Sequence, residues 1–102
     1  YQMSEKIRDE HTDLFVEALL SVNTAEEMYS FLEDVCTIPE IKSMAQRLAV
    51  AVLLKKDVPY HDIVNRTGVS TATISRVNRC LQYGADGYTK VLENLEKSGK
   101  LQ

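Results

Sequence analysis

The sequence predicts an all-α fold, and three observations lead to that prediction. Apolar residues recur every three to four positions in the long segments, no segment alternates apolar and polar residues long enough to form a strand, and glycine and proline number only 4 and 2. A chain of 102 residues, 44% of them hydrophobic, suffices for one domain and is too short for two ordinary ones. We therefore expect a single domain of six helices over residues 3–102, leaving out Tyr1 and Gln2, which precede the natural start residue Met3.

The first half of the chain predicts three helices. The 3.6-residue period predicts an amphipathic helix over residues 4–22, and its apolar residues are Ile7, Leu14, Phe15, Ala18, Leu19 and Val22. Thr24 and Glu27 have the spacing of a capping box and open a second helix, which we expect to bury Met28, Tyr29, Phe31, Leu32 and Val35. Thr37 and Glu40 repeat this spacing and open a third helix, from Ile38 to about Lys56.

The third helix is apolar around most of its circumference from Met44 to Leu54. A surface helix keeps one polar side, so a helix of this kind has to be surrounded by other elements. The rest of so short a chain offers too few residues to cover every side. We therefore expect a homodimer with helices packed between the chains.

Three shorter helices complete the predicted fold, over residues 60–67, 70–82 and 86–97. Gly68 separates the first two, and Tyr83 and Gly84 end the second. The last helix is expected to bury Tyr88, Val91, Leu92 and Leu95.

The net charge of −3 conceals a strong asymmetry along the chain. Residues 1–41 hold 2 Lys and Arg against 10 Asp and Glu, a balance of −8, whereas residues 42–79 hold 7 against 2, a balance of +5. Residues 80–102 hold 3 of each sign. The basic middle segment therefore permits a nucleic-acid partner although the whole chain is acidic.

The sequence indicates a cytoplasmic protein with no membrane partner. No apolar run approaches the roughly 18 residues that a membrane span needs, and the N-terminus carries charges in place of a secretory apolar core. Cys36 and Cys80 are isolated from each other and from any histidine cluster. This isolation favours two buried, reduced thiols over a disulfide or a metal site.

Residues 60–82 have the pattern of a helix-turn-helix, whose second helix enters the major groove of DNA. Gly68 stands at the turn, Ala72 permits close approach, and apolar residues stand where two crossing helices meet, at Ile63, Val64, Val69, Ile74 and Val77. The polar residues left over on the second helix are Ser70, Thr71, Thr73, Ser75, Arg76, Asn78 and Arg79. We expect these residues and Ala72 to face double-stranded DNA, with flanking phosphate contacts from Lys42, Lys55, Lys56 and Arg66.

The segment TIPEIKSMAQRLAVAVLLKKDVPYHDIVNRTGVSTATISRVNRCLQYG, residues 37–84, resembles the Trp-repressor superfamily. Residues 3–97 as a whole resemble its YerC/YecD-like branch of small bacterial regulators, and TGVSTATISRV and AQRLAVAVLL are the most specific parts. The resemblance implies an intertwined homodimer of six-helix chains with DNA-reading heads at a fixed separation. It also implies a sequence-specific DNA-binding transcriptional regulator of the repressor type.

The resemblance also implies an alternative, a repressor that depends on tryptophan or another amino acid. Tryptophan in the tryptophan repressor lies between two arginines, at positions that Arg47 and Arg76 match here, and Thr37 matches a third pocket residue. That repressor has glycine directly after the second arginine, where this chain has Val77. A branched side chain at this position fills the space that the indole needs, so we expect no tryptophan cofactor. The identity of any other small-molecule corepressor stays open.

The two further classes of function to consider are an enzyme and a module that binds only protein. An enzyme needs a nucleophile with a base, paired acids, a metal cluster or a phosphate loop, and the sequence shows none of these, so we expect no catalytic residues and no metal. His11 and His61 are isolated. A helix-turn-helix that contacts only protein is the remaining alternative, and salt-dependent DNA binding distinguishes it from a DNA reader.

Overall fold

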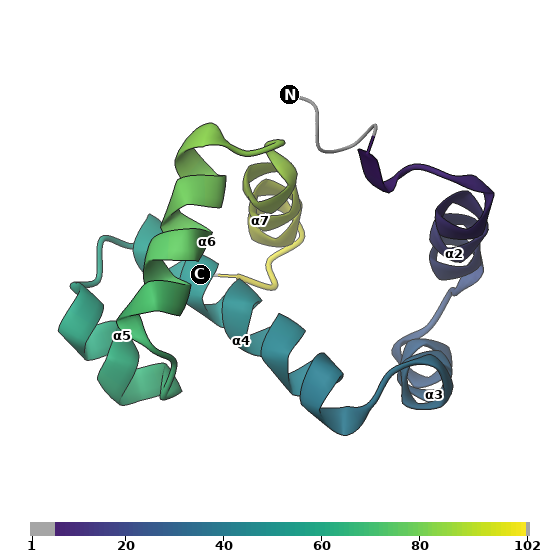
Figure 1. The fold of residues 1–102 in the computed structure, drawn as a ribbon, viewed down its shortest axis with the longest axis horizontal. Helices are drawn as coiled ribbons and strands as arrows, with labels where there is room; N and C mark the ends of the chain where they lie inside the picture. Colours follow the sequence, from purple (N-terminus) through teal and green to yellow (C-terminus); the bar gives the residue numbers. More distant parts are fainter. Residues whose placement is uncertain (1–5, 102) are drawn as a thin grey trace. The chain divides into compact units, whose positions relative to one another are not determined.

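The computed structural model describes residues 6–101, and within them the chain consists of helices and short connections, without a strand. The helices follow in the order α2 (Glu10–Ser21), α3 (Ala25–Val35), α4 (Ile38–Lys55), α5 (Tyr60–Thr67), α6 (Thr71–Tyr83) and α7 (Gly87–Lys97), as Figure 1 shows. The predicted all-α fold of six helices is confirmed. None of the helices in this range is long and apolar enough to cross a membrane.

The chain divides into two compact units, Tyr1–Lys42 and Ser43–Gln102. The first unit holds α2, α3 and the start of α4, and the second holds the rest of α4 with α5, α6 and α7. The expectation of one domain over residues 3–102 stays a prediction.

The first long helix, α2, begins later than the sequence predicts. Residues 6 and 7 are helical, but the chain leaves the helix at Arg8 and Asp9, and α2 begins at Glu10. The predicted uninterrupted helix is wrong here because the carboxylate of Asp9 accepts the N–H of Thr12 at 2.7 Å and caps a new helix. This bond also lowers the pKa of Asp9 below its ordinary value. The predicted start at Ser4 lies outside the described residues.

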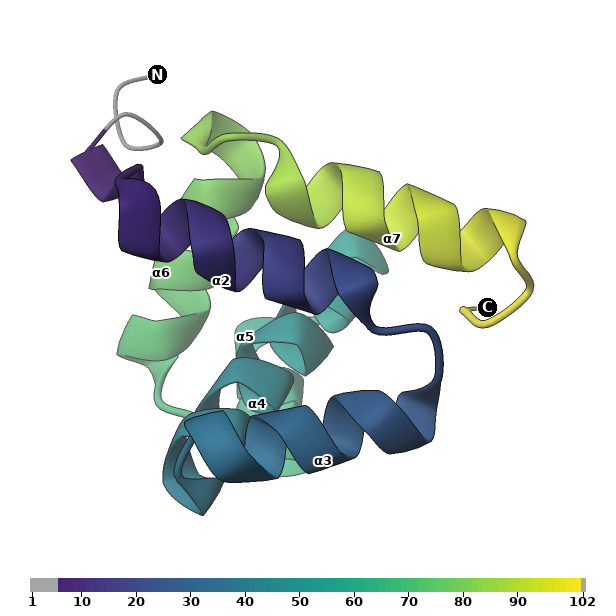
Figure 2. The ribbon, with the colours of Figure 1, turned by 90° about the vertical axis from the view of Figure 1, so that its right-hand side faces the viewer.

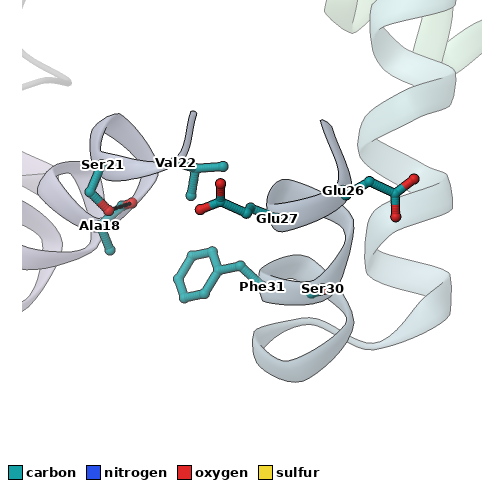
Figure 3. A pocket seen from close by; sticks show the side chains of 7 residues that line it. All are labelled: Ala18, Ser21, Val22, Glu26, Glu27, Ser30 and Phe31. Atoms are coloured by element: carbon teal, nitrogen blue, oxygen red, sulfur yellow. Dashed lines mark hydrogen bonds between the residues drawn. The ribbon is translucent and has the colours of Figure 1, made fainter. Parts of the chain in front are cut away.

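Helices α2 and α3 run in opposite directions and are joined by a short connection (Figure 2). Phe15 and Phe31 pack across them with ring centroids 6.0 Å apart. A cavity of about 460 Å³ lies between the two helices, and Figure 3 shows Phe31 and Glu27 extending from α3 toward Val22. Its lining is Ala18, Ser21, Val22, Glu26, Glu27, Ser30 and Phe31.

The expected burial of α3 is wrong for two residues and only partly met for the other three, because Met28, Phe31 and Leu32 are half-buried. Tyr29 is 69% exposed and Val35 is 50% exposed, and neither α2 nor α3 contains a buried residue. Two short helices cannot enclose side chains on more than their facing sides, so the outer apolar residues stay in contact with water. The exposed apolar residues of this unit include Leu14, Leu20, Tyr29, Val35 and Ile38.

Both predicted capping boxes are present, and the second is more complete than the first. The hydroxyl oxygen of Thr24 accepts the N–H of Glu27 at 3.2 Å, while its O–H donates to the Glu27 carboxylate at 3.3 Å. At the start of α4 the box is complete, because the Thr37 N–H donates to Oε1 of Glu40 at 2.7 Å and the Glu40 N–H donates to the Thr37 hydroxyl at 3.2 Å. The bond from the Thr37 N–H lowers the pKa of the Glu40 carboxyl, with a smaller contribution from the Thr37 side chain.

The second unit has a buried core to which all four of its helices contribute (Figure 1). The core consists of Val50, Ala51, Ile63, Val69, Ile74, Val77 and Leu92. Four of the five apolar positions predicted for the helix-turn-helix are therefore buried, and Val64 is half-buried against them. On α7, Leu92 is fully buried and Tyr88 and Leu95 are half-buried, but Val91 is 47% exposed, which corrects the prediction for that residue.

Helix α4 confirms the unusual character that the sequence predicts for it. Val50 and Ala51 are fully buried, yet Met44 is 44% exposed and Ala45 and Ala49 are also exposed. The helix therefore carries apolar residues that stay exposed within residues 6–101.

The two cysteines are free, as expected, but they are not both buried. Cys36 is half-buried and Cys80 is exposed on α6. The prediction for Cys80 is wrong because Leu81, four positions after Val77, continues the side of α6 that packs against the core, and Cys80 lies away from that side.

Candidate nucleic-acid interface

The turn between α5 and α6 depends on Gly68. Its backbone has φ 75 and ψ 4, in the left-handed region, and its N–H donates to the carbonyl of Val64 at 2.8 Å. This arrangement ends α5 with a single left-handed residue, which glycine adopts without the steric cost of a Cβ. Two packed helices of 8 and 13 residues joined by a short turn form a helix-turn-helix.

The N-terminus of α6 is capped from within the motif. Ser70 is the N-cap, its hydroxyl oxygen accepts the Thr73 N–H at 3.2 Å, and the two hydroxyls lie 3.1 Å apart. The first intrahelical bond runs from the Ile74 N–H to the Ser70 carbonyl. The N–H groups of Thr71 and Ala72 therefore precede the hydrogen-bonded ladder and are available to an approaching phosphate.

Helix α6 has a buried side and an exposed side. Ile74 and Val77 are 0% and 1% exposed and fix the helix against the core. The predicted reading residues that lie exposed on α6 are Thr71, Ala72, Ser75, Arg76 and Arg79, while Thr73 and Asn78 are half-buried. The exposed set combines small residues at the start of the helix with two guanidinium groups further along it. Such a surface can approach a groove closely and reach phosphates or guanine edges.

The basic residues predicted to flank the reading helix lie on α4, directly after α4 and on α5. Arg66 is exposed in the last turn of α5, and Lys56 is exposed just after α4. The Nζ atom of Lys55 lies 3.1 Å from a carboxylate oxygen of Glu96 on α7, and both side chains are partly exposed. Lys42 is exposed and belongs to the first unit. A phosphate that contacts Lys55 therefore shares this lysine with Glu96.

Arg47 and Arg76, predicted as ligand residues, line one cavity of about 210 Å³. The other lining residues are Ser43, Gln46, Val69 and Thr73. Five of the six side chains are polar or charged, so the cavity offers hydrogen-bond donors and positive charge beside the apolar surface of Val69 and of the hydrocarbon parts of the other side chains. Such a lining has the chemistry to hold a small anion.

Thr37, the third predicted ligand residue, and Val77, which was expected to fill the space of an indole, both have structural roles. Val77 is part of the buried core and does not line the cavity beside Arg76. Thr37 belongs to the first unit, where its hydroxyl and N–H form the capping box of α4.

Sequence reasoning missed three participants at this site. Ser43 and Gln46 line the cavity with Arg47, and Glu96 pairs with Lys55. Ser43, Gln46 and Arg47 stand at i, i+3 and i+4 directly before the apolar run of residues 48–54, and this polar stripe was the available signal. Glu96 lies 41 positions after Lys55, and no local pattern connects the two.

Comparison with known proteins places the chain. Residues 10–96 match the family described as Trp repressor protein. The chain belongs to the Trp repressor family. It is 47% identical over 94 residues to the uncharacterised protein YerC of Bacillus subtilis strain 168, covering 92% of this chain and 90% of that one. The match to the YerC-like branch of the family agrees with the resemblance found in the sequence.

Two crystal structures of related proteins have the same fold. A TrpR-like protein from Eubacterium eligens has a TM-score of 0.86 and 47% identity, with coverage of 96% of this chain and 98% of the other. A protein from Staphylococcus aureus, also described in terms of the Trp repressor, has a TM-score of 0.86 and 44% identity over 90% of this chain and 92% of the other. The Trp repressor fold is that of a helix-turn-helix regulator and not that of an enzyme family.

Proposed function

We propose that this member of the Trp repressor family is a cytoplasmic, sequence-specific DNA-binding transcriptional repressor that acts as an intertwined homodimer. One observation carries the proposal: α6 is fixed to the core by Ile74 and Val77 while Arg76 and Arg79 remain exposed on it. A helix held in this way presents the same side chains at the same angle in every encounter, as reading a major groove requires.

The homodimer is supported by the apolar residues that one chain leaves exposed. Leu14, Leu20 and Ile38 are 69%, 72% and 71% exposed, and Met44 on α4 is 44% exposed. Each of these apolar side chains is exposed within its own unit, and a second chain provides apolar side chains that can cover them. Two-fold symmetry then gives two reading helices and two DNA half-sites.

The test of DNA reading begins with the sites that the purified protein selects from genomic DNA fragments. Affinity for a selected site is then measured at several salt concentrations. Arg79→Ala weakens binding and lowers the slope of log affinity against log salt by about one, because one phosphate contact is lost. Thr71→Ala changes the sequence preference more than the salt response. Lys97→Ala removes the same charge from the far end of α7 and serves as the matched control, with an unchanged slope.

The footprint supplies a second criterion. Two-fold symmetric protection with half-sites about 10 base pairs apart, or a multiple of that spacing, supports the proposal. Selected fragments without symmetry, or binding that does not respond to salt, contradict it and favour a helix-turn-helix that contacts protein.

A second candidate function is favoured by the cavity between α4 and α6. Arg47 and Arg76 both line it, so an amino acid or another small anion bound there would touch the reading helix directly. In this candidate the protein is an aporepressor whose DNA affinity depends on that ligand. We propose that the ligand is not tryptophan, because Val77 is packed in the core beside Arg76 and occupies space that the indole would need.

A further inference from the structure

Thr67, the last residue of α5, makes three hydrogen bonds around the turn of the helix-turn-helix. Its O–H donates to the Ile63 carbonyl at 2.7 Å, and its hydroxyl oxygen accepts the N–H of Val69 at 3.3 Å. Its carbonyl accepts a longer bond, 3.5 Å, from the Gln46 side chain of α4. One residue thus connects the end of α5, the residue after Gly68 and the neighbouring helix.

The hydroxyl of Thr67 uses its donor and an acceptor at the same time, as a single O–H group can. The Val69 side chain is 8% exposed, and the bond from its N–H to Thr67 is partly buried. Without the hydroxyl this N–H loses its protein partner in a partly dry position. The turn then has to admit water to this N–H or change the dihedral angles between α5 and α6, and either change loosens the connection between the two helices.

We propose that Thr67 is a positioning residue that sets the angle at which α6 meets DNA, and so determines how well specific sites are distinguished from other DNA. Only Ser70 separates Val69 from the first residue of α6, so a change at the Val69 N–H changes the direction of the reading helix. Phosphate contacts made by long side chains tolerate such a change, whereas base contacts do not. This inference rests on the proposed DNA-binding function and deepens it.

The experiment compares Thr67→Val, which keeps the shape and removes the hydroxyl, with Thr67→Ser, which keeps the hydroxyl. Each variant is measured against a selected site and against unrelated DNA. Thr67→Val reduces the ratio of specific to non-specific affinity about tenfold, comparable to one mismatched base pair. Thr67→Ser stays within about twofold of the wild type because the hydroxyl bonds are kept. Thr89→Val, the same exchange at a half-buried threonine on α7, leaves the ratio unchanged.

Amide hydrogen exchange supplies a readout that does not depend on DNA. The Val69 N–H exchanges slowly in the wild type and in Thr67→Ser and quickly in Thr67→Val, or in Thr67→Ala if the valine variant does not fold. Fast exchange of Val69 in the wild type, or a Thr67→Val variant that discriminates as well as the wild type, overturns the inference. If the wild type binds no DNA specifically, the proposed function fails, and exchange at Val69 still decides whether Thr67 holds the turn.

Discussion

Replacing Gly68 by alanine isolates the cost of the left-handed turn. A Cβ added at Gly68 meets no atom within 4 Å, so the substitution creates no clash, and the only penalty is the backbone conformation at φ +75. A non-glycine residue in this region costs about 1–2 kcal/mol. Alanine also restricts the conformations of the unfolded chain, and this stabilises the folded state by about 0.4–1 kcal/mol. The net loss of stability at Gly68 is therefore between about 0 and 1.6 kcal/mol, with a middle value of about 0.8 kcal/mol.

Gly87, the first residue of α7, is the matched control. A Cβ there also meets no atom within 4 Å, and the residue does not have positive φ. In Gly87→Ala the unfolded chain is restricted in the same way, but the folded backbone is not strained. This variant is therefore as stable as the wild type or more stable. The difference between the two variants then equals the strain alone, about 1–2 kcal/mol, and separates their melting temperatures by at least about 4 °C.

The assay is thermal unfolding followed by circular dichroism, with all proteins at one concentration because dimerisation makes the midpoint depend on concentration. Equal melting temperatures for the two variants would refute the reasoning. Backbone strain at Gly68 could not explain a loss of stability that Gly87→Ala shares.

Three further predictions concern the caps, the cavity and the assembly. The Glu40 carboxylate has a lowered pKa in the folded protein, so its stabilising effect is complete above the ordinary value of 4.5 and is lost as the pH falls through the folded value. Thermal unfolding should accordingly show Glu40→Gln less stable than the wild type near pH 7 and similar to it near pH 2, whereas an equal difference at both would contradict the cap. L-tryptophan should not bind the wild type at micromolar concentration in a calorimetric titration, because fitting the indole costs about ten- to a hundredfold in affinity. Val77→Ala should bind it more tightly, and micromolar binding by the wild type would show that the pocket argument is wrong. Sedimentation should give about 23 kDa, twice the 11.5 kDa of one chain, down to low concentration, and a well-folded monomer would exclude the dimer.

Local patterns predicted the helices and the turn because the forces that set them act over a few residues. The period of apolar residues located Ile63, Ile74 and Val77 in the core, and glycine marked the turn at Gly68. The first helix was predicted too long because the spacing of apolar residues does not show where a side chain caps a helix. Asp9 competes with the helix through its own side chain, and this competition decides where α2 begins.

Burial and pairing were harder to predict because they depend on elements far apart in sequence. Tyr29 and Val35 fit the apolar side of α3 in sequence, but no part of the described chain covers them. The ion pair between Lys55 and Glu96 and the cavity that joins Arg47 to Arg76 arise only when α4 meets α6 and α7. The sequence nevertheless identified both arginines through its resemblance to the family.

The exposed thiol of Cys80 makes the reading helix accessible to chemical labelling. The second cysteine, Cys36, lies in the other unit and is half-buried, so a Cys36→Ser variant leaves one thiol for a fluorescent reporter. Cys80 follows Arg79 directly and lies one turn beyond Arg76. A dye attached there is close enough to the proposed DNA surface to change its emission when a duplex arrives. The protein therefore already contains the attachment point for an optical binding assay on its own α6.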